Sequence, residues 1–160
     1  MRGGALPPAI LCAALAFMLV FAPRRAIWPT IGVLAAALLI AAVLPWPRGW
    51  VEVVFIGCWA SVVVTALLVH LPGGVPVTLA LIAGINAGVW AGATIAEAGS
   101  LADAMRALPC LLLVLPARWL AARGASVAVK VASSWLVAVA ILAATLPIVP
   151  TPGYVPDHME

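Results

Sequence analysis

Charged side chains are scarce in this sequence. They make up 8% of its 160 residues, whereas soluble domains carry about 25%. A water-soluble globule with so few charges would expose apolar patches larger than soluble monomers tolerate. The hydrophobic residues, 66% of the chain, come in long blocks divided by proline, glycine and arginine. Lipid is therefore the expected medium around most of the side chains.

The sequence also lacks the groups that catalysis and metal binding require. Its two histidines and five acidic residues are spread along the chain, and it contains no metalloprotease, nucleophile-elbow, phosphate-loop or paired-carboxylate motif. None of its three cysteines belongs to a CxxC pair. We therefore expect a protein that is not an enzyme and has no cofactor and no metal site. The small, scattered net charge of +3 also argues against a nucleic-acid partner.

The expected fold is an all-α membrane protein, a polytopic bundle of six transmembrane helices with short loops. A spanning helix needs about 20 residues, because the hydrocarbon core is about 30 Å thick and each residue rises 1.5 Å. Six segments come near this length: residues 6–22, 27–44, 50–71, 75–98, 101–123 and 125–146. The first resembles a signal peptide, but no small-x-small cleavage site follows it, so we expect a retained helix.

The fifth segment decides between six spans and five. Its purely apolar part, residues 108–117, is about half a span long and contains Pro109 and Pro116. Ser100 and Asp103 upstream predict an N-terminal capping box, and Gly124 downstream lies where a helix C′ glycine would. These signals favour a complete span with proline kinks, and five spans remain the alternative.

The orientation follows from the basic residues. Short loops make consecutive helices antiparallel. In the six-span arrangement Arg24, Arg25, Arg118, Arg123 and Lys130 share one side, which is therefore expected to be cytoplasmic. The C-terminus is then periplasmic with either count. Abundant Ala, Gly, Pro, Arg and Trp are typical of a GC-rich bacterial genome, so the bacterial inner membrane is the expected location.

Small residues recur at every fourth position in the fourth segment, at Gly84, Gly88, Gly92 and Ala96. This spacing places them on one helix face, where they let a neighbouring backbone approach closely. We expect this stripe to pack against another helix of the same chain. A contact between two copies of the chain, or a substrate path beside a thin helix, are the alternatives.

Four polar residues are candidates for an intramembrane role. Asn86 is the one carboxamide in the chain, and we expect it to bond between helices, with ligand binding as the alternative. Thr94 lies off the small-residue stripe. Glu97 lies near a helix end, where we expect it to reach interfacial water, with Arg106 pairing either with it or with Asp103. His70 is expected to be interfacial or C-capping, with a proton or metal role as the alternative.

Residues 147–160 form a tail of a different kind. Four prolines enforce an extended form. A free tail of this composition would be disordered. Alternatively, it docks on a partner through its single aromatic residue and its charged end, Tyr154, Asp157, His158 and Glu160.

Two functions fit these features. The first is a non-catalytic integral membrane subunit or assembly factor of a larger bacterial inner-membrane complex, surrounded by membrane lipid and bound to a protein partner or to itself. The alternative is a small oligomeric transporter or channel with a polar path near Asn86 and Glu97. Convergence of the polar groups on one water-accessible cavity would favour transport, and separate helix contacts would favour a subunit.

Overall fold

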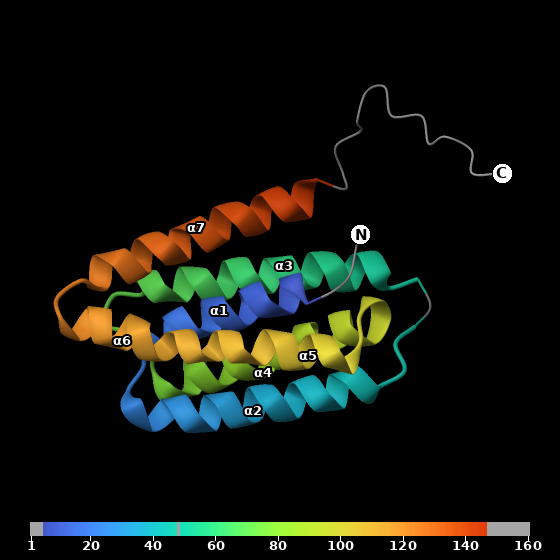
Figure 1. The fold of residues 1–160 in the computed structure, drawn as a ribbon, viewed down its shortest axis with the longest axis horizontal. Coiled ribbons are helices and arrows are strands. Elements are labelled where there is room, and N and C mark those ends of the chain that lie inside the picture. The colour runs from blue at the N-terminus through green and yellow to red at the C-terminus, as the bar shows by residue number, and fades with distance from the viewer. Residues whose placement is uncertain (1–4, 48, 147–160) are drawn as a thin grey trace.

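The computed structural model describes residues 5–47 and 49–146, and every regular element in these ranges is helical (Figure 1). The α-helices are α1 (Leu6–Val20), α2 (Arg24–Val43), α3 (Val51–Leu67), α4 (Val77–Ala98), α5 (Leu101–Ala107), α6 (Val114–Ala122) and α7 (Ser126–Thr145). Two 3-10 helices are η1 (Leu68–His70), which extends α3, and η2 (Leu108–Leu113), which joins α5 to α6. The described chain therefore forms six rods, of which five are long and apolar enough to cross a membrane. This is the make-up of a multi-pass, membrane-embedded α-helical protein.

The rods run up and down, so that the bundle has two distinct ends. The turns at residues 21–23, 71–76 and 123–125 lie at one end, which we call the basic end because Arg24, Arg25 and Arg123 lie there. Helix α1 begins, and helix α7 ends, toward the opposite end (Figure 1). The short connections enforce this antiparallel order.

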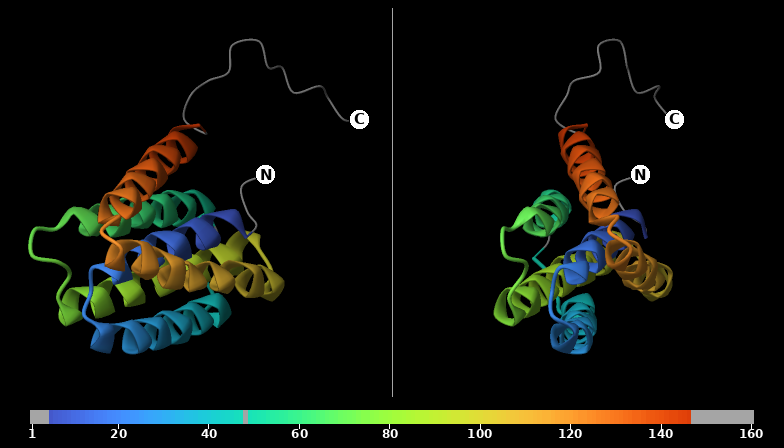
Figure 2. Two further views of the ribbon diagram at one scale, coloured as in Figure 1. Left: turned by 60° about the vertical axis from the view of Figure 1, so that its left-hand side comes forward. Right: turned by 90° about the vertical axis from the view of Figure 1, so that its left-hand side faces the viewer.

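The shortest rod, α1, is the centre of the bundle (Figure 2). Ten of its fifteen residues are buried, and α3, α4, η2, α6 and α7 all contact it. The side chains of Leu11, Leu15 and Leu19 on this helix are completely buried. A helix that is apolar on every side can be covered by lipid or by protein, and here other helices supply most of the cover.

By contrast, α7 lies at the periphery and contacts mainly α3. Figure 2 shows it leaning away from the other rods. Only 17% of its span is buried, and Val131, Trp135 and Leu142 are exposed. Its outer face is therefore available to lipid or to another protein.

The start of α2 and the internal geometry of the fifth rod differ from the sequence-based expectation. α2 begins at Arg24 rather than near residue 27, which places Pro29 inside the helix rather than in its first turn. Proline lacks an N–H, so the carbonyl of Arg25 loses its intrahelical donor. The fifth rod is continuous from 101 to 122, but η2 replaces its middle turns with 3-10 geometry where Pro109 removes another backbone donor.

The end signals predicted for the fifth rod are confirmed. The capping box is present, with the backbone N–H of Ser100 donating to Oδ2 of Asp103 at 2.9 Å. Gly124 has a φ of +84°, and the N–H groups of Gly124 and Ala125 donate to the carbonyls of Ala121 and Leu120. This is the Schellman arrangement, in which glycine accepts the left-handed conformation without strain.

Candidate functional site

The glycines of α4 face α2, and α2 and α4 are the most closely packed pair of helices in the bundle. A Cβ atom built on Gly84 would lie 2.9 Å from the carbonyl oxygen of Thr30, and one on Gly88 would lie 2.5 Å from that of Leu34. A Cβ atom on Gly92 would lie just as close to the carbonyl oxygen of Leu38. All three glycines are buried, whereas Ala96 is exposed. The close contact therefore ends at Gly92 and lies within one chain.

Asn86 projects from α4 toward α3, where its amide donates to the hydroxyl of Ser61. The pair lines a cavity of about 410 Å³ between the two helices, together with Gly57, Thr65 and Trp90. The indole ring of Trp90 packs against the bare backbone of Gly57 and closes one side of the cavity.

The cavity opens sideways, away from the bundle axis. Ala60, Val64 and Ile82 at its margin are exposed. At its base, Thr65 is 1% exposed and its Oγ1 has no hydrogen-bond partner among the described residues. A buried hydroxyl without a partner is costly in an apolar medium. The site can therefore accept an apolar group that carries one hydrogen-bonding atom.

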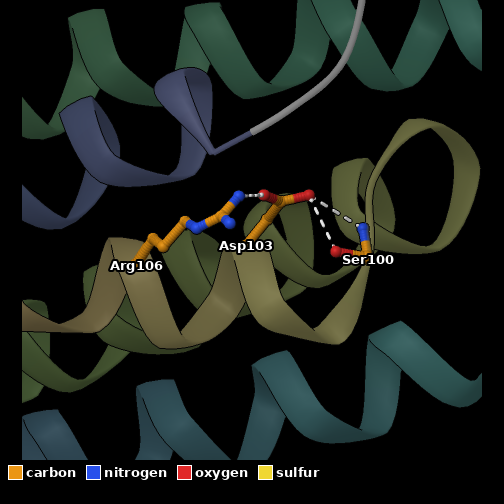
Figure 3. Close-up of polar contacts among 3 residues, drawn as sticks. All are labelled: Ser100, Asp103 and Arg106. Atoms are coloured by element: carbon orange, nitrogen blue, oxygen red, sulfur yellow. Dashed lines mark hydrogen bonds and ion pairs between the residues drawn. The ribbon is translucent and has the colours of Figure 1, made fainter.

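The other polar candidates lie elsewhere. Thr94 is buried and donates to the carbonyl of Trp90 in its own helix, at 2.8 Å. Glu97 is half-buried near the end of α4. Near that end of the bundle, Asp103 accepts bonds from Ser100 and pairs with Arg106 at 3.1 Å (Figure 3). Of the two acids expected as partners of Arg106, the structure thus shows Asp103.

His70 lies at the basic end, where it is exposed. Its Nε2 lies 3.3 Å from Oγ of Ser134 in α7, and the Ser134 hydroxyl is also 3.0 Å from the carbonyl of Lys130. One residue earlier, the buried hydroxyl of Ser133 donates to the carbonyl of Ala66 at 2.8 Å. These contacts attach α7 to α3 and η1.

Arg118 has a structural contact that the sequence did not reveal. Its Nη1 donates to the carbonyls of Leu19 and Ala22, each at 3.3 Å, and so satisfies acceptors at the end of the central helix α1. The partners are 99 and 96 residues away along the chain. From the sequence, Arg118 counted only as one of the basic residues that set orientation.

Within residues 5–47 and 49–146, no group of three His, Cys, Asp or Glu side chains is placed to hold a metal ion. The tail candidates Tyr154, Asp157, His158 and Glu160 lie outside the described residues. Comparisons with protein-family models, with curated proteins and with solved structures gave no match.

The contact between Asn86 and Ser61 predicts a measurable coupling between α4 and α3. Asn86→Leu and Ser61→Ala are each expected to lower the free energy of unfolding, and their effects should overlap in the double variant by about 0.6 to 2 kcal/mol. Denaturant titration in lipid–detergent micelles measures all four proteins of the cycle. Thr78→Val is a control at an exposed position of α4 and should show no coupling to Ser61. Strict additivity of Asn86→Leu and Ser61→Ala would contradict the contact.

Proposed function

We propose that this chain is a non-catalytic integral membrane subunit or assembly factor of a larger bacterial inner-membrane complex. The observation that supports it is the dispersal of the intramembrane polar groups. Asn86 pairs with Ser61 between α4 and α3, Ser133 pairs with Ala66 between α7 and α3, and Thr94 bonds within its own helix. A transport path would require such groups to line one continuous passage.

The arrangement of charges supports an orientation. Arg24, Arg25, Arg118, Arg123 and Lys130 all belong to the basic end of the bundle. Cytoplasmic loops carry the excess of lysine and arginine, so we infer that this end faces the cytoplasm. The opposite end, toward which α7 runs, then faces the periplasm.

The sideways cavity between α3 and α4 is the place where we expect a partner helix to pack. Ala60 gives α3 a small, exposed side chain at the margin of this cavity, which allows close approach of another helix. The orphan hydroxyl of Thr65 and the amide of Asn86 would bond a polar side chain of that helix. Such bonds give the association specificity, since lipid supplies no hydrophobic drive between helices.

Purification of the tagged full chain from its native membrane in mild detergent tests the proposal. A subunit is expected to co-purify with defined membrane proteins in a fixed ratio, as measured by quantitative mass spectrometry. A homo-oligomer without other proteins, which conducts ions or solutes after reconstitution in liposomes, would instead establish the transporter alternative. A lone, inactive chain would also count against a subunit.

A variant at the mouth of the cavity tests the proposed contact. Ala60→Trp is expected to fill the opening and to reduce recovery of the partner by about tenfold or more, which corresponds to about 1.4 kcal/mol of binding free energy. Leu39→Trp, at an exposed position of α2, is the matched control and should retain the partner. Both variants should unfold at the temperature of the parent protein. Equal recovery of the partner with the Ala60→Trp and Leu39→Trp variants would show that the cavity is not part of the interface.

A further inference from the structure

A second hollow lies on another side of the bundle, between α2 and the rod formed by η2 and α6. Its volume is about 660 Å³, within the range of small-molecule sites. Apart from two arginines at one end, its walls are apolar, and they include Ile27, Ile31 and Ala35 on one side and Leu108, Leu112 and Leu115 on the other. Leu112 and Leu115 are exposed, each at 64%. The groove is therefore open to the surrounding lipid.

Arg24 and Arg118 lie together at the basic end of this groove. Arg24 is the first residue of α2 and Arg118 comes from α6, so the fold brings together residues far apart in the chain. Both also line an adjoining hollow of about 330 Å³. The two arginines therefore lie where the apolar groove and the adjoining hollow share lining residues.

No acidic side chain in the described part of the chain forms an ion pair with Arg24 or Arg118, whereas Arg106 is paired with Asp103. The carbonyls of Leu19 and Ala22 fix one nitrogen of Arg118 but do not neutralise its charge. Arginine carries five N–H donors, so donors remain on Arg118 for an anion. Two cations that have no acidic partner and lie beside an apolar groove are complementary to an anionic, amphiphilic ligand.

We propose that this groove binds one anionic glycerophospholipid of the surrounding membrane. The phosphate bonds to Arg24 and Arg118, whose guanidinium groups match phosphate oxygens bidentately. An acyl chain lies along the apolar walls formed by α2, η2 and α6. A lipid without net charge fits the walls equally well but leaves the arginine charges uncompensated, so the site selects by headgroup charge.

Native mass spectrometry of the full chain in detergent tests this proposal, with phosphatidylglycerol and phosphatidylcholine of equal acyl length added in turn. One phosphatidylglycerol is expected to remain bound at concentrations where phosphatidylcholine does not. Arg24→Gln should weaken phosphatidylglycerol binding by about tenfold, because it removes the charge-assisted hydrogen bonds from one guanidinium group to the phosphate. Arg25→Gln is the matched control, because it removes the same charge one residue away and outside the groove. Equal weakening by both variants would show general surface attraction and overturn the proposal.

The apolar part of the site needs its own test, since inorganic phosphate could also bind the arginines. Ala35→Trp fills the groove and should weaken phosphatidylglycerol binding by about tenfold or more, whereas Ala36→Trp, at an exposed position outside the groove, should not. Inorganic phosphate at millimolar concentration should not compete with the lipid. Full competition by phosphate, or unchanged lipid binding in Ala35→Trp, would overturn the proposal. These variants leave Arg118 and its bonds to α1 intact, so the test does not depend on a change that could disturb folding.

Discussion

A Gly88→Leu variant is expected to separate α2 from α4 and to destabilise the bundle strongly. Even a single Cβ at this position would lie 2.5 Å from the carbonyl oxygen of Leu34 and 2.7 Å from the Cβ of Ala37. Neither atom can rotate away, because one belongs to the backbone and the other is fixed to it. The two helices would have to move apart, and the bundle would lose its closest contact.

The graded change Gly88→Ala allows this effect to be measured. Overpacking of this kind costs about 1 to 3 kcal/mol, and leucine should cost more. Equilibrium unfolding in lipid–detergent micelles gives both values. Gly32→Ala on α2 is the matched control, since nothing lies within 4 Å of the position a Cβ would occupy there. It should be neutral or stabilising, because alanine is the better helix former by about 1 kcal/mol. Equal effects of Gly32→Ala and Gly88→Ala would contradict the α2–α4 contact.

A Leu15→Ala variant is expected to lower the free energy of unfolding by about 2 kcal/mol or more. Leu15 is completely buried in the central helix, so its truncation leaves a void among several other helices. In a soluble protein, part of the cost is the lost transfer from water, but that part is small when lipid surrounds the unpacked helix. The cavity and its lost contacts account for the remainder, which places the cost near the lower end of the usual range.

Truncation of a leucine on the outer surface is the control. It shows whether the cost of Leu15→Ala comes from lost packing between helices or simply from the loss of a hydrophobic side chain. Leu39 on α2 is 58% exposed, and lipid chains can fill the space that Leu39→Ala vacates. Its unfolding free energy should therefore stay within about 0.5 kcal/mol of the parent protein. If Leu39→Ala were as destabilising as Leu15→Ala, α1 would not be the packed centre of the bundle.

The features predicted correctly from the sequence are local ones. Ser100, Asp103 and Gly124 end or begin a helix through contacts a few residues apart, so the chemistry of each segment is sufficient to identify them. The predicted start of α2, near residue 27, is wrong, because the basic pair Arg24 and Arg25 after Pro23 is typical of a loop. A helix tolerates charged residues in its first turn when they reach the interface, and tolerates Pro29 at the cost of one backbone bond.

Partners across the bundle could not be predicted in this way. The periodicity of α4 places three glycines on one face, but it does not say that α2 will cover them. Likewise, the bonds of Arg118 to α1 join residues almost a hundred positions apart. The central position of α1 was also hidden, because leucine and alanine are equally stable against lipid and against other helices.

The enclosure of α1 has a consequence for how the protein meets bilayers of different thickness. With 15 residues, this helix is about 22 Å long, well short of an average hydrocarbon core of about 30 Å. If α1 were exposed to lipid, this difference in length would thin the bilayer locally, at a cost of a fraction of a kcal/mol for each Å. Because its neighbours bury most of α1, the membrane meets mainly the outer rods of 20 to 21 residues. A change in membrane thickness therefore acts on the tilt of those outer rods, while the innermost helix keeps its length and its packing.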